Sequence, residues 1–584
     1  MTRFSEALAA KKDFVITCEL IPGRGHAGKS LEGILKFVEG VKSFSAIQAV
    51  SLTDNAGGNP ALSADVVGAE ILAMGMDAII HFSCKDMSRN FIESRAFALQ
   101  RQGIGNLLVI SGDYPVGGFL GLSKPVFDLD SVNALHYLKT MNAGLPIATG
   151  RGESRAARTD FFLGAAVSPF KWNEAACVMQ YVKLEKKIRA GARFIISQLG
   201  WDSRKHLELL QYLRGVLRSD LPVLGSVYVL SAGAAQTMGR GEVPGCWVAP
   251  EMEALVKEES KAEDKGKSAR LERAARQVAV LRGLGYSGAH LEGLGLKAED
   301  VRFIVERSVE LAPGWEEHFR ELCYAPSNPF YYFENGEEIR PVAVPAAVLA
   351  APGAPGPAAA AVQPAVPAAA FVKPGAHATS ASPAAFAAAA SATPATPAVS
   401  CPAARKTGKV RIGSPKFWIL RAMHAMFFVP ETSGYRMMVS FAKGTSGKPA
   451  LARGLKAAEH LAKRTLLDCR SCDDCAAAQT HYICPEARCP KGMRVGPCGG
   501  SRVDGKCEVF PDRFCAWHDI YRRAKSRGEV AKLGYMMPPR NWSLYQTGSW
   551  YNYFLKRDHA SHPVVAVQPE GTEKETLKTG SPAE

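Results

Sequence analysis

The sequence lacks the features of a secreted or membrane-embedded protein. No stretch reaches about 18 consecutive apolar residues, which is the length needed to cross a bilayer. The first twenty residues, MTRFSEALAAKKDFVITCEL, contain no basic start, apolar run or small-residue cleavage site of a secretory signal. We therefore expect a soluble, cytoplasmic protein that inserts no segment into a membrane.

One segment has almost no charge and few large side chains. Residues 341–400 contain 26 Ala and 11 Pro, and Lys373 is the only Lys, Arg, Asp or Glu among them. Repeated Pro blocks the helix that so much Ala would otherwise favour, so this composition is typical of an extended linker. The sequence thereby predicts a first domain at 1–335, a flexible Ala/Pro-rich linker at 336–408, a second domain at 409–565 and a disordered tail at 566–584.

Positive charge is concentrated in the last third of the chain. From Cys401 onward, 30 Lys and Arg stand against 16 Asp and Glu, whereas residues 1–400 carry 41 against 40, so nearly all of the net +15 belongs to the second domain. No nucleic-acid-binding motif accompanies this charge, and we expect no nucleic-acid partner. The 584 residues, 47% of them hydrophobic, are enough for two or three domains with their own cores.

Short runs rich in Val and Ile alternate with helix-length amphipathic segments in the first domain. There are eight such runs: FVITCEL, AIQAVSL, AIIHFSC, NLLVISGD, FFLGAAVSP, FIISQLG, PVLGSVYVL and SGAHLEGLG. Strands that are apolar on both faces and separated by helices predict parallel β/α units, and eight units in about 300 residues predict an α/β fold of the (β/α)8 TIM-barrel type. An open doubly wound sheet is the alternative. The polar stretch 250–273 predicts one charged helix.

Polar residues fall where the predicted strands end. Active-site residues of such barrels lie at the carboxyl ends of the strands and in the loops that follow them. Each of these residues alone could be a helix cap, a turn residue or a hydrogen-bonded core histidine. A converging set instead predicts a catalytic or binding site. The set comprises Glu19, Thr53, Asp54, His81, Ser83, Asp113, Gln198 and His290.

Eight of the 14 cysteines crowd into one short segment of the second domain. The segment opens with Cys-x-x-Cys-x-x-Cys, which is typical of binding to a 4Fe–4S cluster, and eight thiolates make two sets of four. Two zinc sites of four cysteines are the alternative, although zinc sites usually show paired Cys-x-x-Cys knuckles, and one cluster with one zinc is also open. Spacing alone does not say which cysteines share a site. The candidate ligands are Cys469, Cys472, Cys475, Cys484, Cys489, Cys498, Cys507 and Cys515.

Residues from about 10 to 300 resemble the barrel of methylenetetrahydrofolate reductase, a flavin enzyme that interconverts methylene- and methyltetrahydrofolate. The segments that carry the resemblance occur in the family's order: FVITCELIPGRG, SLTDNAGG, IIHFSCKDMSR, GIGNLLVISGDYP, FFLGAAVSPF, KLEKKIRAGARFIISQLGWD and GAHLEG. The resemblance implies that the barrel binds a flavin, either FMN or FAD, together with the folate.

The resemblance also implies roles for individual residues. Glu19 corresponds to the general acid that protonates the folate nitrogen, Asp113 to the aspartate beside pterin and flavin, and Gln198 to the glutamine that hydrogen-bonds the folate. Desolvation at a strand end would raise the pKa of Glu19, as a proton donor near neutral pH requires. The lysines among the implied flavin contacts suit a phosphate. These contacts are Thr53, His81, Ser111, Gly112, Asp113, Glu174, Lys186 and Lys187.

Two departures from the family bear on the electron donor. Ser111 stands where a well-studied branch has arginine, so one flavin contact differs. The segment YVLSAGAAQTM lacks the aromatic side chain that stacks on NADH in that branch. We therefore expect an electron source other than direct reduction by a nicotinamide.

Residues from about 409 to 530 resemble the small cysteine-rich subunit of two-subunit methylenetetrahydrofolate reductases from acetogenic bacteria. The resemblance is carried by CRSCDDC, HYICPEARCPKGMRVGPCGG and GKCEVFPDRFCAWHDIYRR. Fusion through the linker raises the effective concentration of one domain at the other. The resemblance implies electron entry through iron–sulfur clusters. A basic face would steer an acidic carrier such as ferredoxin or flavodoxin, and a larger electron-transfer complex is the alternative partner.

The sequence therefore predicts a flavin-dependent, reversible reduction of 5,10-methylenetetrahydrofolate to 5-methyltetrahydrofolate, with electrons delivered through the second domain. One alternative is the same reductase fed directly by NAD(P)H, with a structural zinc domain. The other is a pterin-binding or methyl-transfer protein without redox chemistry. Zinc in place of iron would favour the first alternative, and the absence of a flavin spectrum would favour the second.

Overall fold

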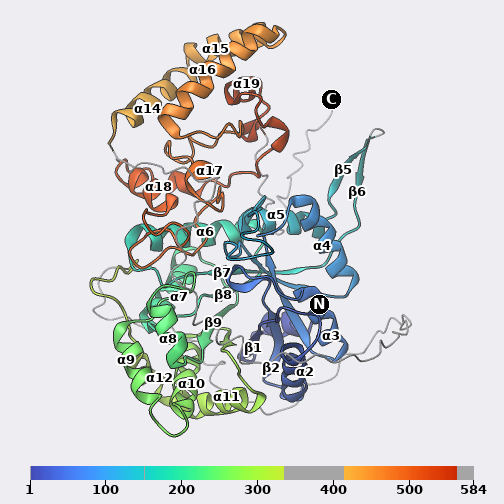
Figure 1. Ribbon diagram of the computed structural model, residues 1–584, viewed down its shortest axis with the longest axis vertical. Helices are drawn as coiled ribbons and strands as arrows, with labels where there is room; N and C mark the ends of the chain where they lie inside the picture. The colour runs from blue at the N-terminus through green and yellow to red at the C-terminus, as the bar shows by residue number, and fades with distance from the viewer. Residues whose placement is uncertain (1, 150–151, 334–412, 562–584) are drawn as a thin grey trace, which may run out of the picture.

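The computed structural model describes residues 2–149, 152–333 and 413–561. The predicted linker at 336–408 and the predicted tail at 566–584 lie outside these described residues. Figure 1 shows two parts, a barrel built from the first domain and a helical, loop-rich part built from the second domain that is stacked on it. We call the second part the cysteine domain.

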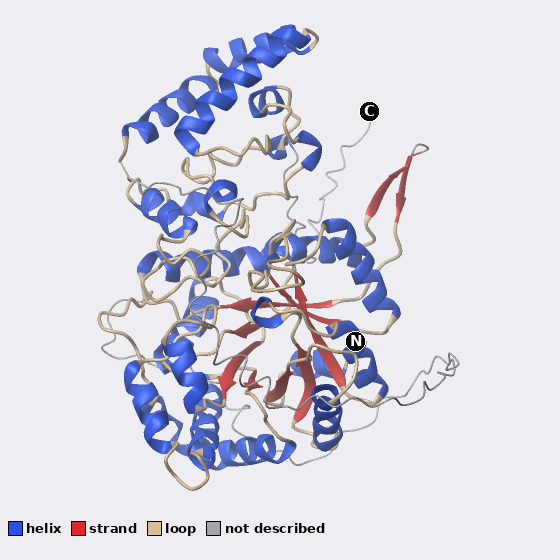
Figure 2. Cartoon of the chain, in the orientation of Figure 1, coloured by secondary structure: helices blue, strands red, loops and turns tan. Residues whose placement is uncertain are grey.

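Eight parallel strands close into a barrel in the order β1-β10-β9-β8-β7-β4-β3-β2. Each of the eight apolar runs found in the sequence forms one of these strands, so the predicted (β/α)8 TIM barrel is confirmed. Figure 2 shows the strands in the interior and helices around them. The strands are β1 Val15–Leu20, β2 Ile47–Leu52, β3 Asp77–Ser83, β4 Asn106–Ile110, β7 Phe162–Val167, β8 Phe194–Ser197, β9 Val223–Tyr228 and β10 Gly288–Glu292.

Helices connect the strands and cover the outside of the barrel. An antiparallel hairpin, β5 Pro146–Thr149 and β6 Gly152–Arg155, is inserted between α5 and β7. The helices are α2 Lys29–Val41, α3 Ala64–Ala73, α4 Arg89–Arg101, α5 Ser131–Asn142, α6 Glu174–Ala190, α7 Ser203–Gln211, α8 Ala232–Gly239, α9 Pro250–Glu259, α10 Lys267–Leu284, α11 Ala298–Leu311 and α12 Trp315–Glu321.

The prediction of one charged helix over 250–273 is wrong, because the chain turns between α9 and α10. Gly266 precedes α10 with φ at +71°, a conformation that glycine adopts without steric cost. The carboxylate of Asp264 accepts hydrogen bonds from the backbone N–H groups of Gly266 at 2.9 Å and Ser268 at 2.7 Å. These bonds satisfy donors at the start of α10 and separate the two helices.

The amino-terminal helix α1, Arg3–Ala10, closes one end of the barrel. Its Phe4 is fully buried and makes edge-to-face contacts with Phe162, at 6.1 Å between ring centroids, and Phe194, at 5.2 Å. Gly164 leaves room for this packing, since a Cβ placed there would lie 2.2 Å from the Phe194 ring. With this end filled by aromatic rings, the polar residues at the carboxyl ends of the strands lie at the opposite end, which we call the mouth.

The cysteine domain consists of helices and long loops. Its core is continuous with the barrel, because Ala175 and Met179 on α6 pack in one buried cluster with Trp517, Ile520 and Tyr521 on α18. The two parts are therefore packed together as well as joined through the chain. The helices are α14 Pro415–Phe427, α15 Ser433–Ser446, α16 Pro449–Leu467, α17 Pro485–Arg488, α18 Ala516–Lys525 and α19 Ser549–Phe554.

Asp130 stabilises both the barrel and its contact with the cysteine domain. Its Oδ1 atom caps α5 by accepting from the backbone N–H groups of Val132 at 2.9 Å and Asn133 at 3.1 Å. Its Oδ2 atom accepts from the backbone N–H of Val495 at 3.0 Å. A helix-capping residue thus also fixes a cysteine-domain loop, which we call the glycine loop and define as residues 495–501, on the barrel.

Candidate functional site

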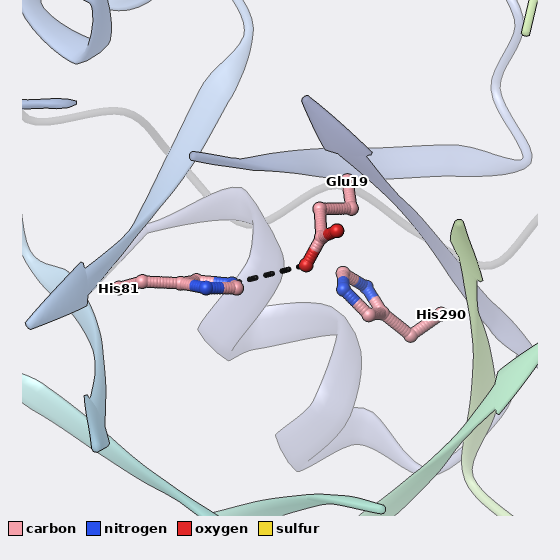
Figure 3. Close-up of side chains that lie close together, drawn as sticks. All are labelled: Glu19, His81 and His290. Carbon is pink, nitrogen blue, oxygen red and sulfur yellow. Dashed lines mark ion pairs between the residues drawn. The ribbon is translucent and has the colours of Figure 1, made fainter. Parts of the chain in front are cut away.

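Glu19, His81 and His290 project into the mouth from β1, β3 and β10 (Figure 3). The carboxylate of Glu19 lies 4.0 Å from Nε2 of His81, which is beyond hydrogen-bond distance. Both ring nitrogens of His290 have partners, Thr17 Oγ1 at 2.7 Å and Ser51 Oγ at 3.3 Å. Because His290 is already paired, we interpret the three residues as an acid–imidazole cluster and not as a metal site.

Burial determines where the protons of this cluster reside. Desolvation raises the pKa of Glu19 well above its ordinary value, and the charge of Glu292 raises it further. Burial lowers the pKa of His81 to about 4 and that of His290 to about 3. These shifts favour the protonated form of the Glu19 carboxyl beside two neutral imidazoles, which is an arrangement able to donate a proton to a substrate.

Glu292 is a second buried carboxyl that the sequence analysis missed. It is the last residue of β10, and burial raises its pKa to about 7. The sequence signal was present, because Glu292 lies in the run SGAHLEG, two residues after His290. Its significance depends on β10 closing the barrel beside β1, and that pairing was not visible in the sequence.

Asp113 and Gly112 follow β4 at the same mouth. The carboxylate of Asp113 accepts a hydrogen bond from the backbone N–H of Gly57 at 2.8 Å, and burial raises its pKa. Gly112 has φ at +81°, and a Cβ there would lie 2.1 Å from Ser83 Oγ, so only glycine fits. The neighbouring Ser111 is buried, with its hydroxyl 3.4 Å from that of Ser131.

The two polar residues that follow β2 have different surroundings. Thr53 is buried at the mouth, and its backbone N–H donates to the carbonyl oxygen of Leu20 at 3.2 Å. Asp54 pairs with Arg95, with 2.6 Å between Oδ2 and the guanidinium nitrogen. Asp54 therefore anchors α4 to the barrel, which is a structural role.

Several buried polar atoms at the mouth have no hydrogen-bond partner. On β3 these are His81 Nε2 and Ser83 Oγ. The others are Ser168 Oγ, directly after β7, and Gln180 Nε2 on α6. Buried polar groups are nearly always paired in proteins, so this group of unpaired atoms is chemically suited to a polar ligand.

Gln198 follows β8 and lies against the cysteine domain. Its Oε1 atom accepts from the backbone N–H of Leu199 at 2.9 Å. A Cβ placed on Gly245 would lie 3.5 Å from Gln198 Nε2 and 3.2 Å from the carbonyl oxygen of Gly499. The predicted folate-binding glutamine and the glycine loop thus meet at one point of the mouth.

The remaining predicted flavin contacts lie on α6, beside the cysteine domain. Lys186 is buried, and its Nζ donates to the carbonyl oxygen of Val495 at 2.9 Å. Lys187 Nζ donates to the carbonyl oxygen of Ala166 at 2.5 Å. Burial lowers the pKa of each lysine to about 7. Their contacts with a flavin phosphate remain a prediction.

Glu174, at the start of α6, contacts α18. It accepts a hydrogen bond from the Tyr521 hydroxyl at 2.8 Å and forms an ion pair with Lys525. The structure therefore brings Glu174 to the interface between the barrel and the cysteine domain, and its predicted contact with flavin also remains a prediction.

The eight clustered cysteines form two groups of four in space. The first four surround one small cavity and the last four surround another. Backbone N–H groups approach sulfur in both groups, from Ser471 to Cys469 Sγ at 3.3 Å and from Gly500 to Cys498 Sγ at 3.4 Å. The distal set comprises Cys469, Cys472, Cys475 and Cys484, and the proximal set comprises Cys489, Cys498, Cys507 and Cys515.

The sulfur spacing bears on the kind of metal that each set suits. Among the described residues, which include all eight, no three cysteine sulfurs lie within 4.8 Å of one another. A tetrahedral zinc ion with Zn–S bonds of about 2.3 Å would hold its sulfurs about 3.8 Å apart. A cube of four irons holds its thiolates further apart than a single ion does. Four thiolates can bind either zinc or a 4Fe–4S cluster, so the sulfur spacing is the feature that bears on the choice.

The proximal set lies next to the mouth and is linked to it by buried charges. Lys491 Nζ donates to the carbonyl oxygen of Gly112 at 2.8 Å and forms a buried ion pair with Glu508. The Cys498 thiol lies 3.5 Å from the Glu508 carboxylate. Lys171, just past β7, donates to the carbonyl oxygen of Ser501 at 2.8 Å. Lys171 and Lys491 could not be identified from the sequence because their carbonyl partners are more than 300 residues away in the chain, and Glu508 becomes significant only through its pair with Lys491.

No helix in the described part of the chain is long and apolar enough to cross a membrane.

Two family models match the chain. Residues 3–307 match a model described as methylenetetrahydrofolate reductase, and residues 449–543 match one described as methylene-tetrahydrofolate reductase C terminal. No curated protein matches the chain.

Two solved structures match about half of this chain at low sequence identity. A Clostridium thermocellum protein, described as binding two copies of 5-methyl-5,6,7,8-tetrahydrofolic acid, is 11% identical with a TM-score of 0.37, over 53% of this chain and 99% of its own. Tryptophan synthase from M. tuberculosis is 12% identical with a TM-score of 0.29, over 55% of this chain and 96% of its own.

Proposed function

Because this chain belongs to the methylenetetrahydrofolate reductase family, we propose that it reduces 5,10-methylenetetrahydrofolate to 5-methyltetrahydrofolate, reversibly, with a flavin at the barrel mouth and electrons supplied through iron–sulfur clusters. The two family models together cover the barrel and residues 449–543 of the cysteine domain. The reductase activity follows from that membership, whereas the flavin and the route of the electrons are our proposal.

The observation that carries the proposal is the position of the proximal cysteine set beside the mouth. Lys491 lines the same small cavity as the proximal set and contacts Gly112, one residue from the predicted catalytic Asp113. Gly499, one residue from Cys498, approaches Gln198 across Gly245. A redox centre held by these cysteines would therefore be next to the folate and flavin site, as electron delivery into the barrel requires.

Glu19 has the environment that the acid step needs. Reduction of the methylene bridge begins when the folate nitrogen is protonated and the bridge opens to an iminium ion. Burial and Glu292 both raise the pKa of Glu19, so that a proton is available there near neutral pH. Neutral His81 and His290 beside it do not compete for that proton, since burial depresses the pKa of both.

The mouth is suited to a flavin. Unpaired polar atoms of His81, Ser83, Ser168 and Gln180 can hydrogen-bond a heteroaromatic ring edge, and the absent side chain of Gly112 allows close approach to the backbone. Thr53, His81, Ser111, Gly112 and Asp113 are the residues proposed to hold the ring, with Glu174, Lys186 and Lys187 toward the rest of the cofactor. Bound flavin would supply the hydride, and iron–sulfur clusters would supply its electrons.

We propose an acidic electron carrier, such as ferredoxin or flavodoxin, as the partner of the cysteine domain. From Cys401 onward the chain carries 30 basic and 16 acidic residues, and this excess of positive charge supports the choice. Attraction between opposite charges accelerates encounter and weakens as salt screens it. The rate of carrier-linked folate reduction should therefore fall as ionic strength rises.

Anaerobic purification with iron, zinc and flavin quantified on one sample tests the proposal. About eight irons and one flavin per chain are expected, because each of two four-cysteine sets would hold one cluster. Reduced ferredoxin should then support methylenetetrahydrofolate reduction, and NADH should not. Zinc with flavin and no iron would overturn the electron route and favour NAD(P)H as the donor. A protein that binds folate without any flavin would overturn the flavin assignment.

A further inference from the structure

Another cavity of the cysteine domain is lined by residues of α14, α16 and α19. Figure 1 shows these helices in the part of the cysteine domain far from the barrel. Its volume is about 220 Å³. An apolar cavity of about 150 Å³ accommodates benzene, so this one has room for more than a single ring. Its aromatic lining residues are His424, Phe428, Tyr482, Trp550 and Tyr553.

One part of the cavity wall is polar and unpaired. Asp558 and His559 line it, and each is only 4% exposed. Asp558 Oδ1 and His559 Nε2 have no hydrogen-bond partner, and neither has Oε1 of Gln479 in the same wall. Buried polar atoms without partners are uncommon, and here three of them share one cavity.

The hydrogen-bonding capacity of these atoms restricts the ligand. His559 Nδ1 lies 2.6 Å from the Asp474 carboxylate and 3.2 Å from a guanidinium nitrogen of Arg494. Because the carboxylate can only accept, Nδ1 carries the proton, and in the neutral ring Nε2 offers a lone pair. Asp558 Oδ1 and Gln479 Oε1 are oxygen acceptors as well. A complementary ligand must therefore donate hydrogen bonds from its edge.

The charged lysine in the wall does not require an anionic ligand. Lys463 Nζ lies 3.0 Å from the Glu459 carboxylate and is also hydrogen-bonded to Ser549. Its charge is balanced within the protein. The aromatic walls favour a planar ring by stacking, and the paired lysine leaves no excess positive charge for an anion.

We propose that this cavity binds a planar, uncharged, fused-ring molecule that donates hydrogen bonds from one edge to Asp558 and His559. An isoalloxazine ring of a flavin could donate from its N3–H group, and a naphthoquinol could donate from one of its hydroxyls. Cys475 of the distal set also lines the cavity, so the ring would lie beside that set, at the side of the cysteine domain remote from the mouth. The inference does not depend on the reaction at the barrel.

The test uses the full-length protein as purified, with the flavin site of the barrel saturated by FMN. Riboflavin and menadiol are titrated separately and anaerobically by calorimetry. Ala462→Phe and Ala478→Phe each place a ring in the cavity from a different wall, and Ala458→Phe makes the same change at an exposed position of α16 outside it. Iron content and melting temperature verify that each variant is folded.

We expect one additional site for riboflavin or menadiol in the wild-type protein and in Ala458→Phe. The affinity of this site should fall at least tenfold in both cavity-filling variants, and Asp558→Leu should weaken it because an acceptor is lost. Binding of riboflavin alone would assign a flavin, and binding of menadiol alone would assign a quinol. Absence of the extra site in the wild-type protein, or equal affinity in Ala462→Phe, Ala478→Phe and Ala458→Phe, would overturn the proposal.

Discussion

Glu19 and Glu292 lie opposite each other on the adjacent parallel strands β1 and β10. The register pairs Cys18 with Leu291, so the next residue of each strand is a glutamate at the mouth. The Glu292 carboxyl is buried and that of Glu19 is partly buried, and the charge of Glu292 raises the pKa of Glu19. Two carboxyls this close cannot both ionise without a large electrostatic cost, so one proton is retained between them near neutral pH.

Substituting Glu292 should change the pH dependence of catalysis. In Glu292→Gln the charge that raises the pKa of Glu19 is gone, so Glu19 loses its proton at lower pH. The alkaline limb of the pH–rate profile for folate reduction should shift to lower pH while the flavin spectrum stays unchanged. An unshifted alkaline limb would show that Glu292 does not act on the proton donor.

The same carboxyl should affect stability in a defined pH window. The pKa of Glu292 is raised from an ordinary value near 4.5 to about 7, so the folded protein binds a proton that the unfolded chain releases. Its contribution to stability is present below about 4.5 and is lost as pH rises to about 7. From about pH 5 to about pH 8, the melting temperature of Glu292→Gln should therefore fall less than the melting temperature of the wild-type protein.

Removing the acid itself should abolish most folate turnover. Glu19→Gln retains the shape of the side chain but donates no acidic proton, and we expect folate reduction to slow by about 10²- to 10⁴-fold. Flavin content and flavin reduction by the electron donor should be retained. Turnover near the wild-type rate would contradict the assignment of Glu19 as the acid.

The division of the cysteines can be tested by double substitutions. Replacing Cys475 and Cys484 by serine affects only the distal set, and replacing Cys498 and Cys507 affects only the proximal set. Each of these variants should retain about half of the wild-type iron. The matched control, Cys475→Ser with Cys498→Ser, removes one ligand from each set and should lower the iron content further. Equal iron loss in all three variants would argue against two separate sets.

Lys491 and Glu508 should be energetically coupled within the cysteine domain, at its contact with the barrel. Lys491→Met leaves the buried Glu508 carboxylate without its cation, and removal of one partner of a buried pair costs about 3–5 kcal/mol. Adding Glu508→Gln removes the stranded charge and should recover a large part of that loss. Anaerobic thermal unfolding of the two single variants and the double variant measures the coupling. If the stability losses of the two single variants simply add in the double variant, the coupling is contradicted.

The sequence by itself determined the barrel and the kind of chemistry at its mouth. Runs such as FVITCEL and IIHFSC carry both the strand pattern and a polar residue at the strand end, and both are local properties of the chain. The positions of Glu19, His81 and His290 at one mouth follow from this pattern, because every strand of such a barrel points the same way.

Only the tertiary structure decided which distant groups meet. Lys491 lies 379 residues from Gly112 in the chain, and the division of the cysteines into two sets depends on the path of the loops between them. The raised pKa of Glu19 likewise depends on β10 closing against β1 and bringing Glu292 to the same mouth. Contacts of this kind arise from packing between segments far apart in sequence, and no local pattern of residue types encodes them.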